Sequence, residues 1–220
     1  MARDMTGAVL WDLDGTIVDS EEYHWRAWRD AMAAEGTPIT REQFLETFGW
    51  RNDAIIPRWL GNRATPERVE RIGDAKEANY RSLVRQNGIE PLPGADDWVR
   101  RLNADGWVQA VASSAPRLNI EVVLEVLGLK DFFQAVASAE DVHRGKPDPE
   151  VFLLAASRLG VPPERSIVVE DARAGVEAAR RAGMRSIALS RTGARLGADL
   201  EVTSFRELPP GAFRDLLQQG

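Results

Sequence analysis

Short apolar runs and amphipathic stretches alternate along this chain, mainly after residue 92. Apolar runs typical of buried strands occupy residues 8–11, 108–113, 135–138, 166–170 and 186–189. Apolar positions with helical spacing predict helices at residues 95–104, 117–127, 149–159 and 174–182. A short strand at 201–203 and a helix beginning at Gly211 follow. This alternation predicts an α/β fold with a parallel sheet.

Residues 21–87 have a different pattern, with helical spacing and no segment typical of a strand. Helices are predicted at 21–35, 54–60 and 66–87, and a further one begins after Thr40, whose spacing to Gln43 fits a capping box. Ser20 or Asp19 is a candidate N-cap for the first helix. A helical block between strand-bearing regions is typical of an insertion. We therefore expect a Rossmann-like, doubly wound parallel sheet domain formed by residues 1–16 and 92–220, with an inserted helical domain at residues 17–91.

Two aspartates stand directly after the first predicted strand. Asp12 and Asp14 are followed by Gly15 and Thr16. Carboxylates at i and i+2 of an extended segment share one face, and a hard cation such as Mg²⁺ would relieve their repulsion. One carboxylate could then act as a nucleophile while the other transfers protons. An ordinary Asp-Gly turn explains this segment equally well. The residues at the ends of the other predicted strands therefore have to distinguish a catalytic site from a turn.

Further polar residues fall at the same edge of the predicted sheet, because parallel strands direct their carboxyl ends to one side. Ser113 and Ser114 end one apolar run, Glu170 and Asp171 end another, and Lys146 lies in the loop before the helix at 149–159. Serines could hold phosphoryl oxygens, the lysine could neutralise charge, and the acids could bind metal. Each also has an ordinary explanation as a turn serine, a solvated lysine or a helix cap.

Composition narrows the choice of partners. The 220 residues carry a net charge of −6, which argues against nucleic acid or an anionic membrane as the main partner. The chain contains no cysteine, which excludes disulfides and thiolate metal sites. No apolar run approaches the roughly 18 residues of a membrane span, and the N-terminal residues lack the apolar core of a signal peptide. We expect a cytoplasmic enzyme; the sequence leaves its oligomeric state open, and a monomer is compatible with it.

The segment from Asp12 to Thr16 resembles the first motif, D-x-D-G-[TV], of the haloacid dehalogenase superfamily. Ser113, the segment Gly-Lys-Pro-Asp-Pro around Lys146, and Glu170-Asp171 followed by Gly175 are similar to its other three motifs. The resemblance implies that Asp12 is a nucleophile that becomes phosphorylated and that Asp14 is the general acid/base. It also implies that Ser113, with Ser114 beside it, and Lys146 bind the phosphoryl group. Mg²⁺ would be bound by Asp12, Asp14 and Asp171, with Glu170 binding directly or through water.

The helical insertion contains the segment Glu22–Trp28 and has Lys76 four residues before Tyr80. In both features it resembles the cap of the subgroup that includes the β-phosphoglucomutases and related sugar-phosphate phosphatases. By that resemblance His24 positions the acid/base and Lys76 contacts substrate. Arg51 is a candidate to meet a second phosphate. A buried structural histidine and a lysine on a solvated helix face are the ordinary explanations of His24 and Lys76. Those mutases grip a distal phosphate with a polar run after the motif-two serine, where this chain has Ala115-Pro-Arg117 and only Arg117 keeps a phosphate-binding group. A phosphatase acting on a small phosphorylated metabolite, such as a sugar phosphate, is therefore expected, with β-phosphoglucomutase and a catalytically silent phospho-ligand-binding relative as alternatives.

Overall fold

A parallel sheet forms the centre of the molecule. The computed structural model describes residues 7–218. Residues 1–6 and 219–220, predicted to belong to the sheet domain, lie outside this part. The six-stranded sheet has the order β3-β2-β1-β4-β5-β6, with all pairs parallel. This confirms the predicted doubly wound α/β fold. The strands are β1 (Ala8–Trp11), β2 (Val108–Ala112), β3 (Ala135–Ala137), β4 (Ser166–Glu170), β5 (Arg185–Leu189) and β6 (Leu200–Val202).

The strand order places β1 at the centre of the sheet. Leu10 of β1 pairs with Ala110 of β2 on one side and with Val168 of β4 on the other. The chain builds β2 and β3 outward from β1 and then crosses to build β4, β5 and β6 on the opposite side. The strand order therefore reverses between β1 and β4. In doubly wound sheets, ligands bind at the carboxyl ends of the strands beside such a reversal.

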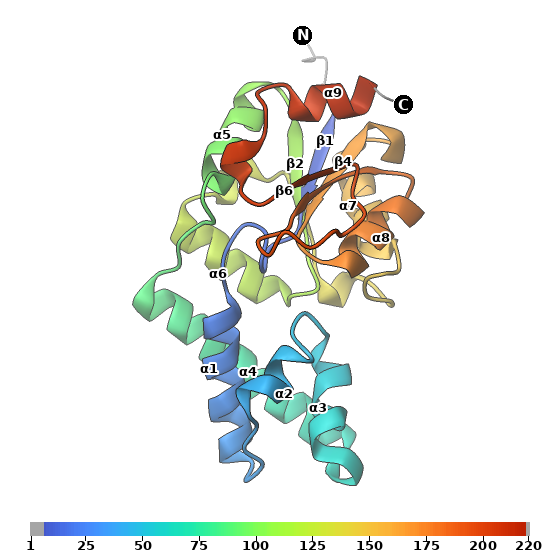
Figure 1. The fold of residues 1–220 in the computed structure, drawn as a ribbon. Coiled ribbons are helices and arrows are strands. Elements are labelled where there is room, and N and C mark those ends of the chain that lie inside the picture. Colours follow the sequence, from blue (N-terminus) through green and yellow to red (C-terminus); the bar gives the residue numbers. More distant parts are fainter. Residues whose placement is uncertain (1–6, 219–220) are drawn as a thin grey trace.

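Helices cover both faces of the sheet (Figure 1). Alternate residues of β1 point to opposite faces, so Val9 and Trp11 belong to one apolar core while Ala8 and Leu10 belong to another. The first core packs against α5 (Ala95–Ala104), α6 (Arg117–Leu127) and α9 (Ala212–Gln218). The second packs against α7 (Glu150–Leu159) and α8 (Arg173–Arg181).

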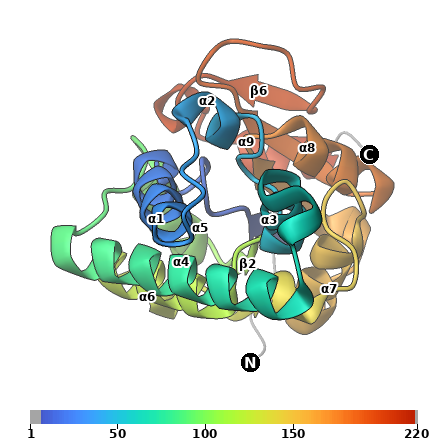
Figure 2. The same ribbon diagram turned by 90° about the horizontal axis from the view of Figure 1, so that it is seen from below.

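A separate helical block lies beyond the carboxyl ends of the strands, as Figure 1 shows from the side and Figure 2 from below. It has its own apolar core, which includes Trp28, Met32 and Phe44. Two chain segments join it to the sheet domain, and they lie side by side because the backbone N–H of Leu92 donates to the Ile17 carbonyl over 2.7 Å. The block consists of α1 (Glu21–Ala34), α2 (Arg41–Leu45), α3 (Asn52–Leu60) and α4 (Pro66–Asn87).

The four helices of this block begin within two residues of their predicted positions. The capping box of Thr40 and Gln43 is present at α2, as predicted. Ser20 occupies the N-cap position of α1, but its hydroxyl makes no capping bond. The helix predicted at 54–60 begins two residues earlier, at Asn52. Between residues 7 and 218, no helix combines the length and apolar character that a bilayer crossing requires.

Candidate active site

The site begins where β1 ends. The backbone N–H of Asp12 donates to the Val169 carbonyl over 2.9 Å, which extends the pairing of β1 with β4 by one residue. Gly15 follows with φ at +87°, and a Cβ atom on it would lie 2.1 Å from Oδ2 of Asp171. Glycine is required here both for the positive φ and for the close approach. The segment is therefore a turn, and one that places its backbone against an acidic side chain of the neighbouring strand.

Lys146 lies among the strand ends, and its side chain is 9% exposed. Its Nζ donates to Oδ1 of Asp12 and to Oε1 of Glu170, both over 2.6 Å, and to the carbonyl of Ala112 over 3.2 Å. These contacts use all three ammonium protons. Burial alone would lower the pKa of Lys146, but the charges of Asp12 and Glu170 raise it above its ordinary value. The lysine is therefore a fixed positive charge against Asp12.

Three acidic side chains surround the lysine. Within residues 7–218, Asp12, Glu170 and Asp171 are the group whose ligand oxygens lie within 4.8 Å of one another. Burial, together with the charges of Glu170 and Asp171, raises the pKa of Asp12 well above its ordinary value against the effect of Lys146. Burial and the charge of Glu170 raise the pKa of Asp171 to about 7. This excess of negative charge on oxygen donors fits a divalent cation of the hard class.

The three carboxylates differ in how many oxygens remain for a metal. Glu170 uses Oε1 on Lys146, and its Oε2 accepts from the backbone N–H groups of Asp171 and Ala172, each over 2.9 Å. From the described residues, the Asp171 side chain accepts one bond, from the Thr16 hydroxyl over 3.3 Å. Asp12 and Asp171 are therefore better placed as direct metal ligands than Glu170, because both oxygens of Glu170 already accept hydrogen bonds from the protein.

Asp14 makes its side-chain contacts with Ser20 and with His24 of the helical block. Its Oδ1 accepts from the Ser20 hydroxyl over 2.5 Å and lies 3.2 Å from Nε2 of His24. Burial would raise the pKa of Asp14, but His24 and Ser20 lower it below the ordinary value. The carboxylate of Asp14, predicted among the metal ligands, is not in the group around Lys146. The two aspartates are two residues apart in the chain but have opposite electrostatic environments.

His24 connects Asp14 to the helical block. Its Nδ1 lies 3.0 Å from Nζ of Lys76, and its ring stacks on Tyr80 with centroids 4.2 Å apart. An ammonium group only donates, so Nδ1 accepts, and the proton of the neutral ring is on Nε2, from which it is donated to Asp14. Lys76, which is 3% exposed, also pairs with Glu77 over 2.9 Å. The structure thus joins Asp14, His24 and Lys76 into one chain of contacts.

The remaining predicted residues lie around this centre. Ser113 is buried at the end of β2, and its Oγ accepts from the backbone N–H of Ala115 over 3.1 Å, while Ser114 is partly exposed. Arg51 extends from the helical block to the sheet domain, where it donates to the Ala139 carbonyl over 2.9 Å. Arg117 pairs with Asp141 over 2.6 Å. Among the described residues, the hydrogen bonds and ion pairs of these two arginines lead to other partners than the acidic group around Lys146.

Sequence reasoning missed Ser20 and Glu77 as parts of this arrangement. The sequence indicates Ser20 only as a helix cap, although its position six residues after Asp14 places it on the returning turn. Glu77 is adjacent to Lys76 on α4 and looks in the sequence like one more charge of a solvated helix face. It is 6% exposed, and only the packing of α4 against neighbouring helices reveals this.

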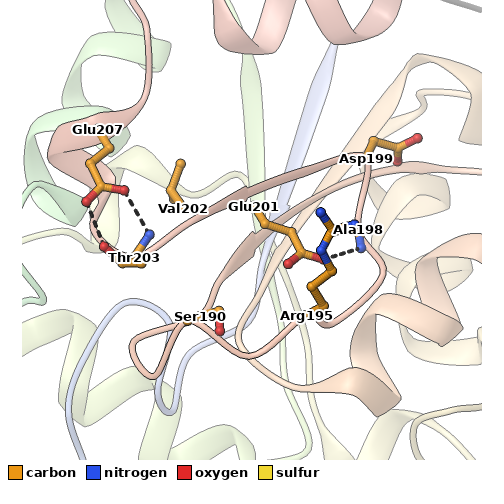
Figure 3. Close-up of a pocket in the computed structure, with 9 residues that line it drawn as sticks. Ser190, Arg195, Ala198, Asp199, Glu201, Val202, Thr203 and Glu207 are labelled. Atoms are coloured by element: carbon orange, nitrogen blue, oxygen red, sulfur yellow. Dashed lines mark hydrogen bonds between the residues drawn. The ribbon is translucent and has the colours of Figure 1, made fainter.

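A surface depression of about 390 Å³ lies elsewhere, beside β6, and none of the predicted site residues lines it (Figure 3). The two glutamates that line it accept hydrogen bonds from nearby residues of the same segment, residues 196–203. Glu201 accepts from the backbone N–H groups of Leu196, Gly197 and Ala198, and Glu207 accepts from Thr203. These carboxylates stabilise the loop.

Comparisons with known proteins agree with this geometry. A family model for haloacid dehalogenase-like hydrolases matches residues 9–189. Hexitol phosphatase B of Escherichia coli (strain K12) is 35% identical over 222 residues, covering 96% of each chain, and β-phosphoglucomutase of Bacillus subtilis (strain 168) is 31% identical over 213 residues, covering 91% of each. The crystal structure of CbbY from Rhodobacter sphaeroides in complex with phosphate has a TM-score of 0.86 and 30% identity, covering 96% of this chain and 100% of that one. The resemblance expected from the four motifs is confirmed: this chain belongs to the haloacid dehalogenase-like hydrolase family.

Proposed function

We propose that this protein is a Mg²⁺-dependent phosphatase that acts on a small phosphorylated metabolite of the sugar-phosphate class through a phosphorylated Asp12. The observation that carries the proposal is the contrast between the two aspartates. Asp12 lies beside Lys146 in a group suited to a cation, while Asp14 is held by Ser20 and His24 at the face of the helical block. One carboxylate is placed to meet a phosphoryl group and the other to exchange protons.

In the first step, a carboxylate oxygen of Asp12 attacks phosphorus in line with the ester bond. The phosphorus–oxygen bond to the sugar breaks, and the protonated form of Asp14, which its lowered pKa makes the minor form in the free protein, gives its proton to the leaving oxygen. Lys146 offsets charge on the phosphoryl oxygens, and Ser113 hydrogen-bonds to one of them. Mg²⁺ held by Asp12 and Asp171 would supply further stabilisation of the charge on the transferring group.

In the second step, a water molecule attacks the phosphorylated Asp12 and releases inorganic phosphate. Asp14 takes a proton from this water. The hydrogen bonds of Ser20 and His24 favour the carboxylate form of Asp14, which is the form that accepts the proton. Residues 17–91 act as a cap that covers the site and limits access of bulk water during the first step.

A mutase would pass the phosphoryl group to a sugar hydroxyl in place of water and has to hold a second phosphate. Among relatives, the Escherichia coli protein is a hexitol phosphatase and the Bacillus subtilis protein a β-phosphoglucomutase, so similarity supports both reactions. Arg117, the candidate for the second phosphate on α6, is already paired with Asp141. This contact favours the phosphatase.

A phosphorus NMR time course tests the proposal. The parent is incubated with Mg²⁺, β-glucose 1-phosphate and a trace of glucose 1,6-bisphosphate, and then with other sugar and hexitol phosphates. Inorganic phosphate as the main product supports a phosphatase, whereas accumulation of glucose 6-phosphate with little inorganic phosphate would establish the mutase. A protein that turns over none of these esters and fails to bind BeF₃⁻ with Mg²⁺ would be the catalytically silent relative.

A further inference from the structure

A buried polar contact joins the cap to the sheet domain at a distance from the reacting groups. Nδ2 of Asn119, near the start of α6, donates to Oε2 of Glu77 on α4 over 2.6 Å. Asn119 is 1% exposed and Glu77 is 6% exposed. The four motifs include neither residue. A buried carboxylate hydrogen-bonded to the other domain holds both domains in one relative position, because separation would break the bond.

The rest of the network fixes the direction of this bond. Nη1 of Arg81 donates to Oδ1 of Asn119 over 3.0 Å, so the amide oxygen is turned to Arg81 and the amide NH₂ group to Glu77. The other oxygen of Glu77 accepts from Asn52 over 2.7 Å and from Lys76 over 2.9 Å, both within the cap. Lys76 and Asn52 lower the pKa of Glu77 against the effect of burial. Glu77 is therefore a charged acceptor shared by the two domains.

The Glu77–Asn119 contact is linked to Asp14 through the residue next to Glu77 in the chain. Lys76 precedes it directly and reaches Nδ1 of His24, which in turn contacts Asp14. Asn119 lies on the helix that follows the Ser113–Ala115 turn, where we place the phosphoryl group. The Glu77–Asn119 contact thus connects the helix that leads from the phosphate-binding turn to the cap lysine of the acid/base chain.

We propose that Glu77 and Asn119 form a clasp that holds the cap in the position where Lys76 and His24 orient Asp14. Both are positioning residues, since they act on the reaction through Lys76. This inference deepens the proposed function and rests on the role of Asp14 in it. Loss of the clasp should leave the reacting groups intact but reduce the fraction of molecules in which Asp14 is oriented.

The chain offers a matched control. Asn52 and Asn119 each donate one amide hydrogen bond to Glu77, but Asn52 does so from within the cap and Asn119 from the other domain. Asn119 also accepts from Arg81 of α4, so N119A removes both of its bonds to the cap, whereas N52A removes none between the domains. N119A is expected to lower kcat for acetyl phosphate with Mg²⁺ by roughly tenfold, the factor expected for a hydrogen bond to a charged group. N52A should stay within about twofold of the parent, because the bond it removes does not cross between domains.

Exchange of the carboxylate and the amide between positions 77 and 119 distinguishes a loss of positioning from a loss of packing. N119D places two buried carboxylates against each other and should be the most impaired variant. E77Q/N119D restores an amide–carboxylate bond in the opposite direction, with the introduced carboxylate beside Arg81, and should recover much of the lost kcat. Circular dichroism establishes that each variant is folded, and the reversed pair keeps the test informative if N119A alone fails to fold.

Cap position can be measured without turnover. The chain has no cysteine, so spin labels placed at the exposed positions Glu70 on α4 and Ser157 on α7 by E70C and S157C report the distance between cap and sheet domain. N119A should lengthen or broaden this distance, whereas N52A and E77Q/N119D should match the parent. The clasp is refuted if N119A and N52A agree in both kcat and distance, or if the parent already shows the long distance. A parent without turnover of any phosphate ester would overturn the proposed function, and the distance measurement would still decide on the clasp.

Discussion

Replacement of Lys146 by methionine tests the arrangement at the strand ends most directly. K146M keeps an unbranched side chain that can still lie over the Phe152 ring, whose centroid is 4.9 Å from Nζ, but it removes the charge. Asp12 and Glu170 then lose the ammonium to which each is bound over 2.6 Å. The variant therefore has buried like charges without their counterion.

The size of the effect follows from burial. Breaking a buried ion pair by removal of one partner costs about 3–5 kcal/mol. Asp12, whose pKa is already raised, relieves part of this cost by taking up a proton, so we expect about 3 kcal/mol. For a protein of this length, that corresponds to a decrease in Tm of roughly 6–12 °C.

Thermal unfolding with EDTA and with Mg²⁺ measures this effect. The deficit in Tm should shrink in Mg²⁺, because a divalent cation among the carboxylates offsets the same excess charge. Turnover should stay lower by about 10²–10³-fold, since the cation does not replace the lysine against the phosphoryl group. K130M, which removes an exposed lysine, is the control and should leave both quantities unchanged. A Tm of K146M in EDTA within about 2 °C of the parent would refute the electrostatic account.

Three further predictions follow from particular residues. D12N should abolish phosphate release and leave the circular dichroism spectrum unchanged; turnover within about tenfold of the parent would remove Asp12 as the nucleophile. G15A should weaken Mg²⁺ binding in calorimetry, because its Cβ would lie 2.1 Å from Asp171, whereas G36A, with a similar positive φ and nothing within 4 Å, should leave Mg²⁺ binding intact. Arg71 and Arg68 lower the pKa of Glu35 to about 2, so its contribution to stability is present above pH 4.5 and is lost as the pH falls toward 2. E35Q should therefore lower the free energy of unfolding by about 1 kcal/mol or less at pH 7, and a urea titration in which this difference persists at pH 2 would contradict the assignment.

The sequence was sufficient for the fold and for the residues around Lys146. Buried strands such as β1 and β4 appear as largely apolar runs, and a polar residue stands at the end of each or directly after it, at the edge to which the parallel sheet directs it. The contacts of Asp14 could not be predicted in the same way. They depend on how α1 and α4 pack, which brings His24 against Lys76 across 52 positions of the chain. Asn119 was hidden for the same reason, because its partner lies on a helix of the other domain.

The place of β1 in the chain also affects the order in which the protein is assembled during synthesis. β1 pairs only with β2 and β4 among the described strands, and these begin at Val108 and Ser166. The helices between β1 and β2 have an apolar core of their own. Because the contacts in this core are nearer in sequence, these helices are able to fold before β1 has paired with β2 and β4. Asp12 is thus made before both of the strands that flank β1 and is among the last residues to be enclosed. Until β4 leaves the ribosome, the apolar strand that carries it depends on the growing chain or on chaperones for protection from aggregation.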